Sequence, residues 1–148
     1  MHFDLDYNSS TNNEIYTNVK RIEINKANSK AIATIQSFSN LNENWDSYGA
    51  EVPTNYSIIR AINFVTWLSQ KQIDVYFTIP LPDGGILIEL KENNASLEIE
   101  FAENENEKDS ITANYEDEVN AEDDFNDTTR DSYLRWLICP DGNCPGDL

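Results

Sequence analysis

The chain has 148 residues, of which 39% are hydrophobic, and a formal net charge of −17. This length favours a single domain over residues 1–148, and no apolar run approaches the roughly 20 residues that a membrane helix needs. The sequence therefore disfavours a membrane protein, and a field of this sign disfavours direct binding to nucleic acid or to an anionic membrane.

The N-terminal segment shows little regular pattern. Residues 1–13 are polar and are expected to form a loose lead-in. They lack the basic and apolar regions of a secretory signal, so a cytoplasmic location is expected. Residues 14–25 fit two patterns, because apolar residues recur at helical spacing up to Ile22, whereas Ile22 and Ile24 alternate as in a strand. Helix and strand both stay open for this segment.

Two amphipathic helices are predicted next. The first is capped by Asn28 or Ser29 and ends near Asn40. The second begins with Thr54 as its N-cap and runs to about Gln70. The apolar faces of the two helices are formed by Ala31, Ile32, Ile35 and Phe38, and by Ile58, Ile62, Val65 and Leu68.

The loop between the helices reads NENWDSYGAEVPT over residues 42–54. Asp46 can accept backbone N–H bonds and fix a turn, and Gly49 can adopt a positive φ. We favour a packed aromatic corner over a binding loop in which Trp45 and Tyr48 anchor a partner, but both interpretations stay open.

From Ile73 onward the apolar period changes to two, which predicts strands. With Asp83 and Gly84 as a two-residue turn, Ile79 lies opposite Ile88 and Phe77 lies opposite Leu90. With Asn93 and Asn94 as the next turn, the predicted pairs are Leu90 with Leu97, Ile88 with Ile99, and Ile86 with Phe101. A fourth strand is expected at Ile111, Ala113 and Tyr115.

The other face of this sheet is predicted to be acidic. The same register places Glu89 directly opposite Glu98, and like charges in this position cost stability. The predicted residues of this outer face are Tyr76, Thr78, Leu87, Glu89, Glu98 and Glu100.

The C-terminal part is expected to be less regular. Residues 116–127 read as an acidic linker held by Val119 and Phe125. Asp127 or Thr128 is then expected to cap a short helix, with Tyr133, Leu134, Trp136 and Leu137 on its apolar side. Residues 139–148 are expected to be irregular, with Cys139 and Cys144 either paired or free. The predicted fold class is α+β, with helices on one face of a three- to four-stranded antiparallel meander and a short C-terminal helix.

The sequence offers little catalytic chemistry. The one histidine, His2, lies near the N-terminus, which disfavours histidine-based catalysis and histidine-based metal sites. Phosphate-binding glycine loops are missing from the sequence, and carboxylate pairs are so abundant that they carry no signal. We therefore expect no enzyme activity, no cofactor and no metal.

A resemblance covers residues 41–101. The motif N-W-D-x-Y-G-A, a Pro-Thr helix start, P-x-x-D-G-G and L-E-I-E resemble those of a group of small uncharacterised bacterial proteins. Such proteins often occur among mobile or defence-related genes, which implies an accessory, antitoxin or inhibitor role.

The uneven charge suggests a function. Residues 89–148 carry eighteen acidic and four basic residues, a net charge of −14. This predicts a protein-binding module that inhibits or regulates a basic toxin, nuclease or defence-system component, partly by nucleic-acid mimicry. The alternatives are an accessory subunit that contacts its complex through aromatic residues, and a small carboxylate-dependent hydrolase. The predicted partner-binding residues are Glu89, Glu98, Glu100, Glu116, Asp117, Glu118, Glu122, Asp123, Asp124, Trp45 and Tyr48.

Overall fold

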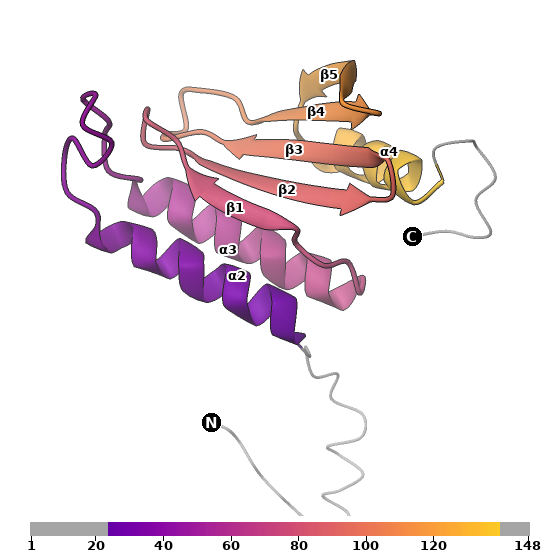
Figure 1. Ribbon diagram of the computed structural model, residues 1–148, viewed down its shortest axis with the longest axis horizontal. Helices are drawn as coiled ribbons and strands as arrows, with labels where there is room; N and C mark the ends of the chain where they lie inside the picture. The colour runs from indigo at the N-terminus through magenta and orange to yellow at the C-terminus, as the bar shows by residue number, and fades with distance from the viewer. Residues whose placement is uncertain (1–23, 140–148) are drawn as a thin grey trace, which may run out of the picture.

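The computed structural model describes residues 24–139 as an antiparallel sheet with helices on one face (Figure 1). The predictions for residues 1–13 and for most of 14–25 and 139–148 fall outside this range. The elements in chain order are α2 (Lys26–Ser37), the 3₁₀ helix η1 (Phe38–Asn40), α3 (Asn55–Gln70), β1 (Phe77–Pro80), β2 (Ile86–Glu92), β3 (Ala95–Phe101), β4 (Ser110–Tyr115), β5 (Glu118–Asp124) and α4 (Asp127–Ile138).

The helix starts follow side-chain caps. The Thr54 hydroxyl accepts a bond from the backbone N–H of Ser57, which confirms Thr54 as the N-cap of α3. The predicted cap of α2 is wrong, because Asn25 caps this helix and Asn28 lies inside it. The predicted cap of α4, Asp127 or Thr128, is also wrong, since Asn126 is the cap and forms a capping box with Thr129.

The sheet has five strands in the order β1-β2-β3-β4-β5, with every neighbouring pair antiparallel. The α+β class is therefore confirmed, whereas the predicted strand count of three to four is too low. The extra strand is β5, which forms where an acidic linker was predicted over residues 116–127. Its side chains are mostly exposed, so backbone pairing with β4 stabilises it without an apolar face.

The second hairpin has the predicted register. Leu90 lies opposite Leu97 and Ile88 lies opposite Ile99, while residues 93–94 form a two-residue turn. The predicted opposition of two glutamates across this hairpin is confirmed as well.

The first hairpin is shifted by one residue from the predicted register. Ile79 lies opposite Leu87 rather than Ile88, because the connecting loop spans residues 81–85 instead of a two-residue turn. A shift of one residue exchanges the two faces of a strand. Phe77 and Ile79 therefore lie on the outer face, and Thr78 lies on the inner face.

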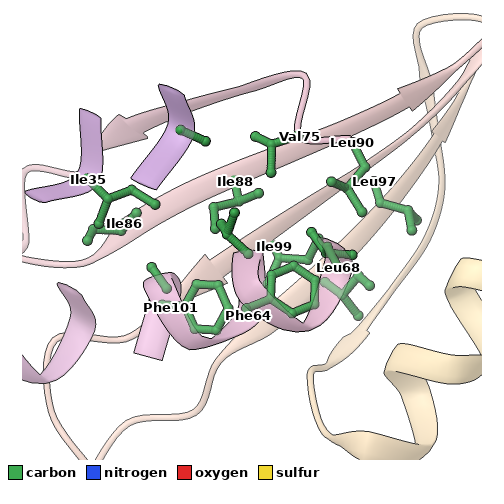
Figure 2. Packing of buried hydrophobic residues seen from close by; sticks show 14 of the residues in the cluster. Ile35, Phe64, Leu68, Val75, Ile86, Ile88, Leu90, Leu97, Ile99 and Phe101 are labelled. Atoms are coloured by element: carbon green, nitrogen blue, oxygen red, sulfur yellow. The ribbon is translucent and has the colours of Figure 1, made fainter. Parts of the chain in front are cut away.

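The core lies between the inner face of the sheet and the helices (Figure 2). Aliphatic side chains of β2, β3 and β4 meet side chains from α2, α3 and α4, so all three helices share one layer. The helices leave the outer face of the sheet uncovered (Figure 1). The fully buried aliphatic residues of this core are Ile35, Val65, Leu68, Ile86, Ile88, Leu90, Leu97, Ile99, Ile111 and Leu134.

Candidate functional site

The uncovered face of the sheet carries carboxylates on three of its five strands. Residues paired across an antiparallel ladder point to the same face. One row therefore runs from Glu89 through Glu98 and Thr112 to Glu122. The next row runs from Leu87 through Glu100 and Ser110 to Asp124. We call the set formed by Glu89, Glu98, Glu100, Glu122 and Asp124 the acidic face.

Two of these carboxyl groups resist ionisation. Partial burial raises the pKa of Glu89, and the neighbouring charge of Glu98 raises it further. Partial burial also raises the pKa of Glu100, with added repulsion from Asp83, Glu98 and Glu122. The charges of the acidic face are therefore held close enough to repel one another, which a basic partner would relieve.

We expect mild acidification to stabilise the protein. The folded pKa values of Glu89 and Glu100 exceed the unfolded value of about 4.3. At pH values between the unfolded pKa and the folded pKa, the folded state therefore binds more protons than the unfolded state. The ionised carboxylates of Glu89 and Glu100 destabilise the fold fully above their folded pKa values, and this destabilisation is removed as the pH falls through those values. Urea unfolding from neutral pH down to the unfolded pKa of about 4.3 measures this change.

The double substitution Glu89→Gln and Glu100→Gln serves as the control for that pH dependence. The variant should be more stable than the wild type at neutral pH, and the difference should shrink as the pH falls. If the difference in free energy of unfolding between the variant and the wild type stayed constant over this pH range, the prediction would be wrong.

The other acidic residues predicted as partner-binding do not join the acidic face. Glu116 and Asp117 form the turn before β5 with positive φ angles of 51° and 67°. Glu118 lies opposite Tyr115 at the start of β5. Asp123 lies opposite the core residue Ile111 and therefore on the face of the sheet that the helices cover. Burial raises the pKa of Tyr133 there, and the charge of Asp123 raises it further.

An apolar strip borders the acidic face, and sequence reasoning missed most of it. Phe77 and Ile79 are 40% and 41% exposed on β1, and Leu87 lies beside Ile79 on β2 with 9% exposure. We call Phe77, Ile79 and Leu87 the apolar strip. The predicted register had placed Phe77 and Ile79 in the core, since no residue in the loop reveals its length.

The loop around Trp45 and Tyr48 is held by its own hydrogen bonds. The Asp46 carboxylate accepts bonds from the backbone N–H groups of Tyr48 and Ala50 at 2.8 and 3.0 Å. The Trp45 indole N–H donates to the carbonyl oxygen of Glu51 at 2.8 Å. Trp45 is half-buried but is not among the side chains packed against the core, and Tyr48 is 92% exposed and supports no packing.

We expect different effects from the two aromatic residues of this loop. Trp45→Ala should lower the free energy of unfolding by about 1–2 kcal/mol, less than the roughly 3–5 kcal/mol of a core aromatic, because Trp45 lies outside the core cluster. Tyr48→Ala should change it by less than about 0.5 kcal/mol. Urea denaturation of both variants measures the difference, and equal losses would contradict it.

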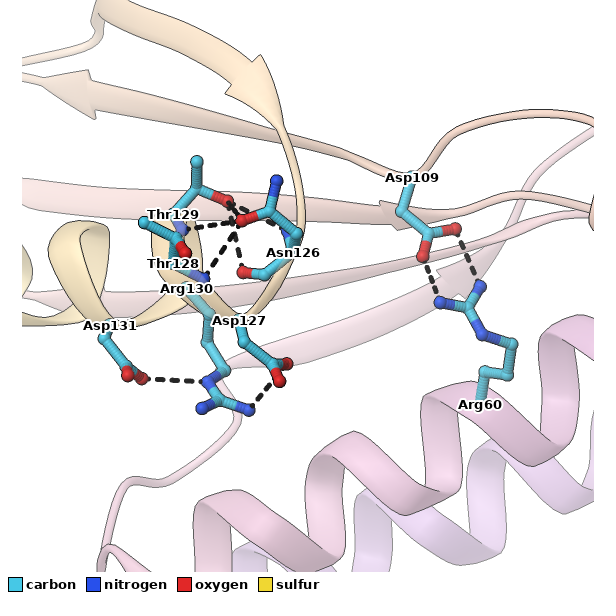
Figure 3. Close-up of polar contacts among 8 residues, drawn as sticks. All are labelled: Arg60, Asp109, Asn126, Asp127, Thr128, Thr129, Arg130 and Asp131. Atoms are coloured by element: carbon cyan, nitrogen blue, oxygen red, sulfur yellow. Dashed lines mark hydrogen bonds and ion pairs between the residues drawn. The ribbon is translucent and has the colours of Figure 1, made fainter.

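A partly buried ion pair joins α3 to the segment before β4 (Figure 3). The Arg60 guanidinium donates two bonds to the Asp109 carboxylate, one of them 2.8 Å long between Nη1 and Oδ1. The same Oδ1 accepts the backbone N–H of Ala102 at 2.8 Å, and Asp109 raises the pKa of Arg60. Asp109 is 8% exposed, so this contact fixes the loop between β3 and β4 rather than serving a ligand.

The start of α4 is fixed by a second polar cluster (Figure 3). The Asn126 side chain accepts bonds from two backbone N–H groups of the first turn. Arg130 pairs with Asp127 and Asp131, and its guanidinium lies 4.0 Å from the centre of the Trp67 ring on α3. These contacts fix the chain where it leaves β5.

Other kinds of site find little support in residues 24–139. This part of the chain contains no group of three or more His, Cys, Asp or Glu arranged to hold a metal ion. Its helices include none long and apolar enough to cross a membrane. Cys139 is disulfide-bonded, and the other cysteine of the chain, Cys144, lies outside the described range.

No protein-family model, curated protein or solved structure matches this chain. The resemblance over residues 41–101 therefore stays a prediction, and the case for a function depends on the geometry of the sheet.

Proposed function

We propose that the protein is a non-enzymatic, acidic protein-binding module that inhibits or regulates a basic partner that acts on nucleic acid. The observation that carries this proposal is the acidic face, where five carboxylates share one uncovered side of a sheet. The partner would be a toxin, a nuclease or a defence-system component, and binding would cover its phosphate-binding surface.

The sheet supports this role because it fixes the carboxylates in space. Neighbouring strands lie about 4.8 Å apart, and alternate residues along one strand lie about 6.8 Å apart. Glu98 and Glu100 are alternate residues of the central strand β3 and so have the spacing along one strand, whereas Glu89 lies on the neighbouring strand opposite Glu98. Arginine binds carboxylates and phosphates with the same paired N–H groups, so a fixed array of carboxylates can occupy a site built for phosphates.

A second candidate function is an accessory subunit that contacts its complex through aromatic residues. The 92% exposure of Tyr48 on a hydrogen-bonded loop favours this alternative. Such a contact would depend little on salt, whereas binding through the acidic face would weaken as ionic strength rises.

The proposed location is the cytoplasm, where most basic nucleic-acid enzymes of a bacterial cell act. One observation weighs against this location, because Cys139 is disulfide-bonded and disulfides are rare in cytosolic proteins. The charge argument holds in either compartment.

The test is the affinity for a partner captured from native cells. Replacing Glu98 and Glu100 by Gln should slow association and weaken binding by about tenfold in low salt, since charged rim contacts govern the rate of encounter. The effect should fade between about 0.05 and 0.5 M salt as the Debye length shrinks. The partner's nucleic acid should compete with the protein.

The matched control removes the same charge elsewhere. Glu43 and Glu92 are both exposed and lie outside the acidic face, so Glu43→Gln with Glu92→Gln keeps the net charge of the test variant. An equal loss of affinity in the two double variants would contradict the proposal, since only the total charge would then matter.

A further inference from the structure

The acidic face and the apolar strip form one continuous surface. The pairing of β1 with β2 sets Phe77 beside Glu89 and Ile79 beside Leu87. The pairing of β2 with β3 then sets Leu87 beside Glu100. These two rows therefore begin with apolar side chains on β1 and become acidic toward β3 and β5, whereas the next row on this face consists of Lys91, Ser96, Asn114 and Val119.

Such a surface favours some occupants over others. A second copy of this chain would bring another net charge of −17 against the acidic face, so self-association there is disfavoured. The face presents side chains and no free backbone groups, so an extended segment lying on it would gain no backbone hydrogen bonds from the sheet. A strand added at the edge of β1 would meet Pro80, which has no N–H to donate.

A helix needs no backbone hydrogen bonds from the sheet because it satisfies its own backbone. We propose that the partner contacts this protein through a basic amphipathic helix that lies across the strands. Its apolar side chains rest mainly on the exposed Phe77 and Ile79, beside the nearly buried Leu87, and its lysine or arginine side chains meet the acidic face. This inference rests on the proposed function and specifies the element of the partner that is bound.

The dimensions of the sheet fit this arrangement. The helical pitch of about 5.4 Å is close to the strand spacing of about 4.8 Å, so successive turns of the helix lie over successive strands. The span from β1 to β5 covers four strand spacings, or roughly 19 Å, which about 13 helical residues match. Apolar residues would occupy the turns over β1 and β2, and basic residues the turns over β3 to β5.

The test uses the full chain and two synthetic peptides of about 16 residues. The first peptide forms a helix with leucines on one face of its first two turns and arginines on the same face of its last two turns. The second has the same composition apart from two central alanines replaced by proline, which prevents the helix. Affinity is measured by titration calorimetry.

The helical peptide should bind at least about tenfold more tightly than its proline counterpart. Ile79→Ser should weaken binding by about fivefold, since part of an isoleucine side chain leaves water on contact. Phe77→Ser should do the same, and melting curves of both variants should show folded protein. Ile59→Ser is the matched control, because Ile59 is 58% exposed on α3 and should leave the affinity unchanged.

The outcomes separate this inference from the proposed function. If the two peptides bind equally, or if the helical peptide does not bind, the inference that the partner binds through a helix is wrong. Unchanged affinity in Ile79→Ser and Phe77→Ser, with a loss in the Glu98→Gln and Glu100→Gln double variant, overturns the inference and leaves the proposed function standing. A double variant that binds like the Glu43→Gln and Glu92→Gln control overturns both.

Discussion

Replacing Asn28 by alanine should lower the free energy of unfolding by about 4 kcal/mol. The Asn28 side chain is completely buried, and its amide donates to the Ser69 hydroxyl at 2.9 Å and to the Ile73 carbonyl at 3.0 Å. Its carbonyl oxygen accepts the backbone N–H of Val75 at 2.8 Å. The alanine variant leaves the buried N–H of Val75 and the partly buried carbonyl of Ile73 without this partner, each at a cost of about 1–3 kcal/mol, whereas the Ser69 hydroxyl keeps its bond to the Val65 carbonyl.

Thermal and urea unfolding measure this loss, which corresponds to a melting temperature lower by roughly 10–15 °C. The matched control is Asn63→Ala, because Asn63 is an exposed residue of α3 and alanine favours a helix. A loss in Asn28→Ala no greater than that of the control would contradict the role assigned to this side chain. Val75 leads directly into β1, so Asn28 also sets the position of the apolar strip.

The second large effect is expected from Asp109→Ala, at about 3 kcal/mol. The substitution removes both bonds to Arg60 and leaves the backbone N–H of Ala102 without its acceptor. Arg60 is partly exposed, with 35% of its side chain accessible, so water can solvate its charge after the substitution. The expected loss in free energy of unfolding is therefore at the low end of the range for breaking a buried ion pair.

The control for Asp109 is Asp124→Ala. Asp124 pairs with Lys108 at 3.2 Å, but both side chains are largely exposed, and such pairs contribute less than about 1 kcal/mol. Urea unfolding of the two variants should therefore differ by at least about 2 kcal/mol. Equal losses would show that the Arg60–Asp109 contact contributes no more than a surface pair.

The sequence defines a register where the turn is short and unambiguous. Asn93 and Asn94 are the only residues between β2 and β3, and the alternating leucines and isoleucines on both sides admit one pairing. The turn around Asp83 is different, because its hydrogen bonds close a five-residue loop between Leu81 and Gly85. Alternation alone fits either face of β1, so its register could not be predicted.

The same reasoning explains which parts of the candidate site were predictable. The opposition of Glu89 and Glu98 follows from the second hairpin and was predicted. The contribution of Glu122 depends on β5, whose acidic and nearly uniform sequence lacks the apolar alternation that identifies a strand. Asn28 was predicted only as a helix cap. Its buried hydrogen bonds join it to residues more than 40 positions away, and the local pattern around Asn28 does not reveal them.

The order of the strands has a consequence for how the protein folds. Each strand pairs with the next one in the chain, through connections at residues 81–85, 93–94, 102–109 and 116–117. Such local closures are fast, so hairpins can form before the helices are in place. The bonds of Asn28 to Val75 and of Arg60 to Asp109 instead join residues 47 and 49 positions apart. Contacts that form late, after the transition state, affect mainly the unfolding rate. We therefore expect these two links to determine how long the helices stay docked rather than how quickly the sheet assembles.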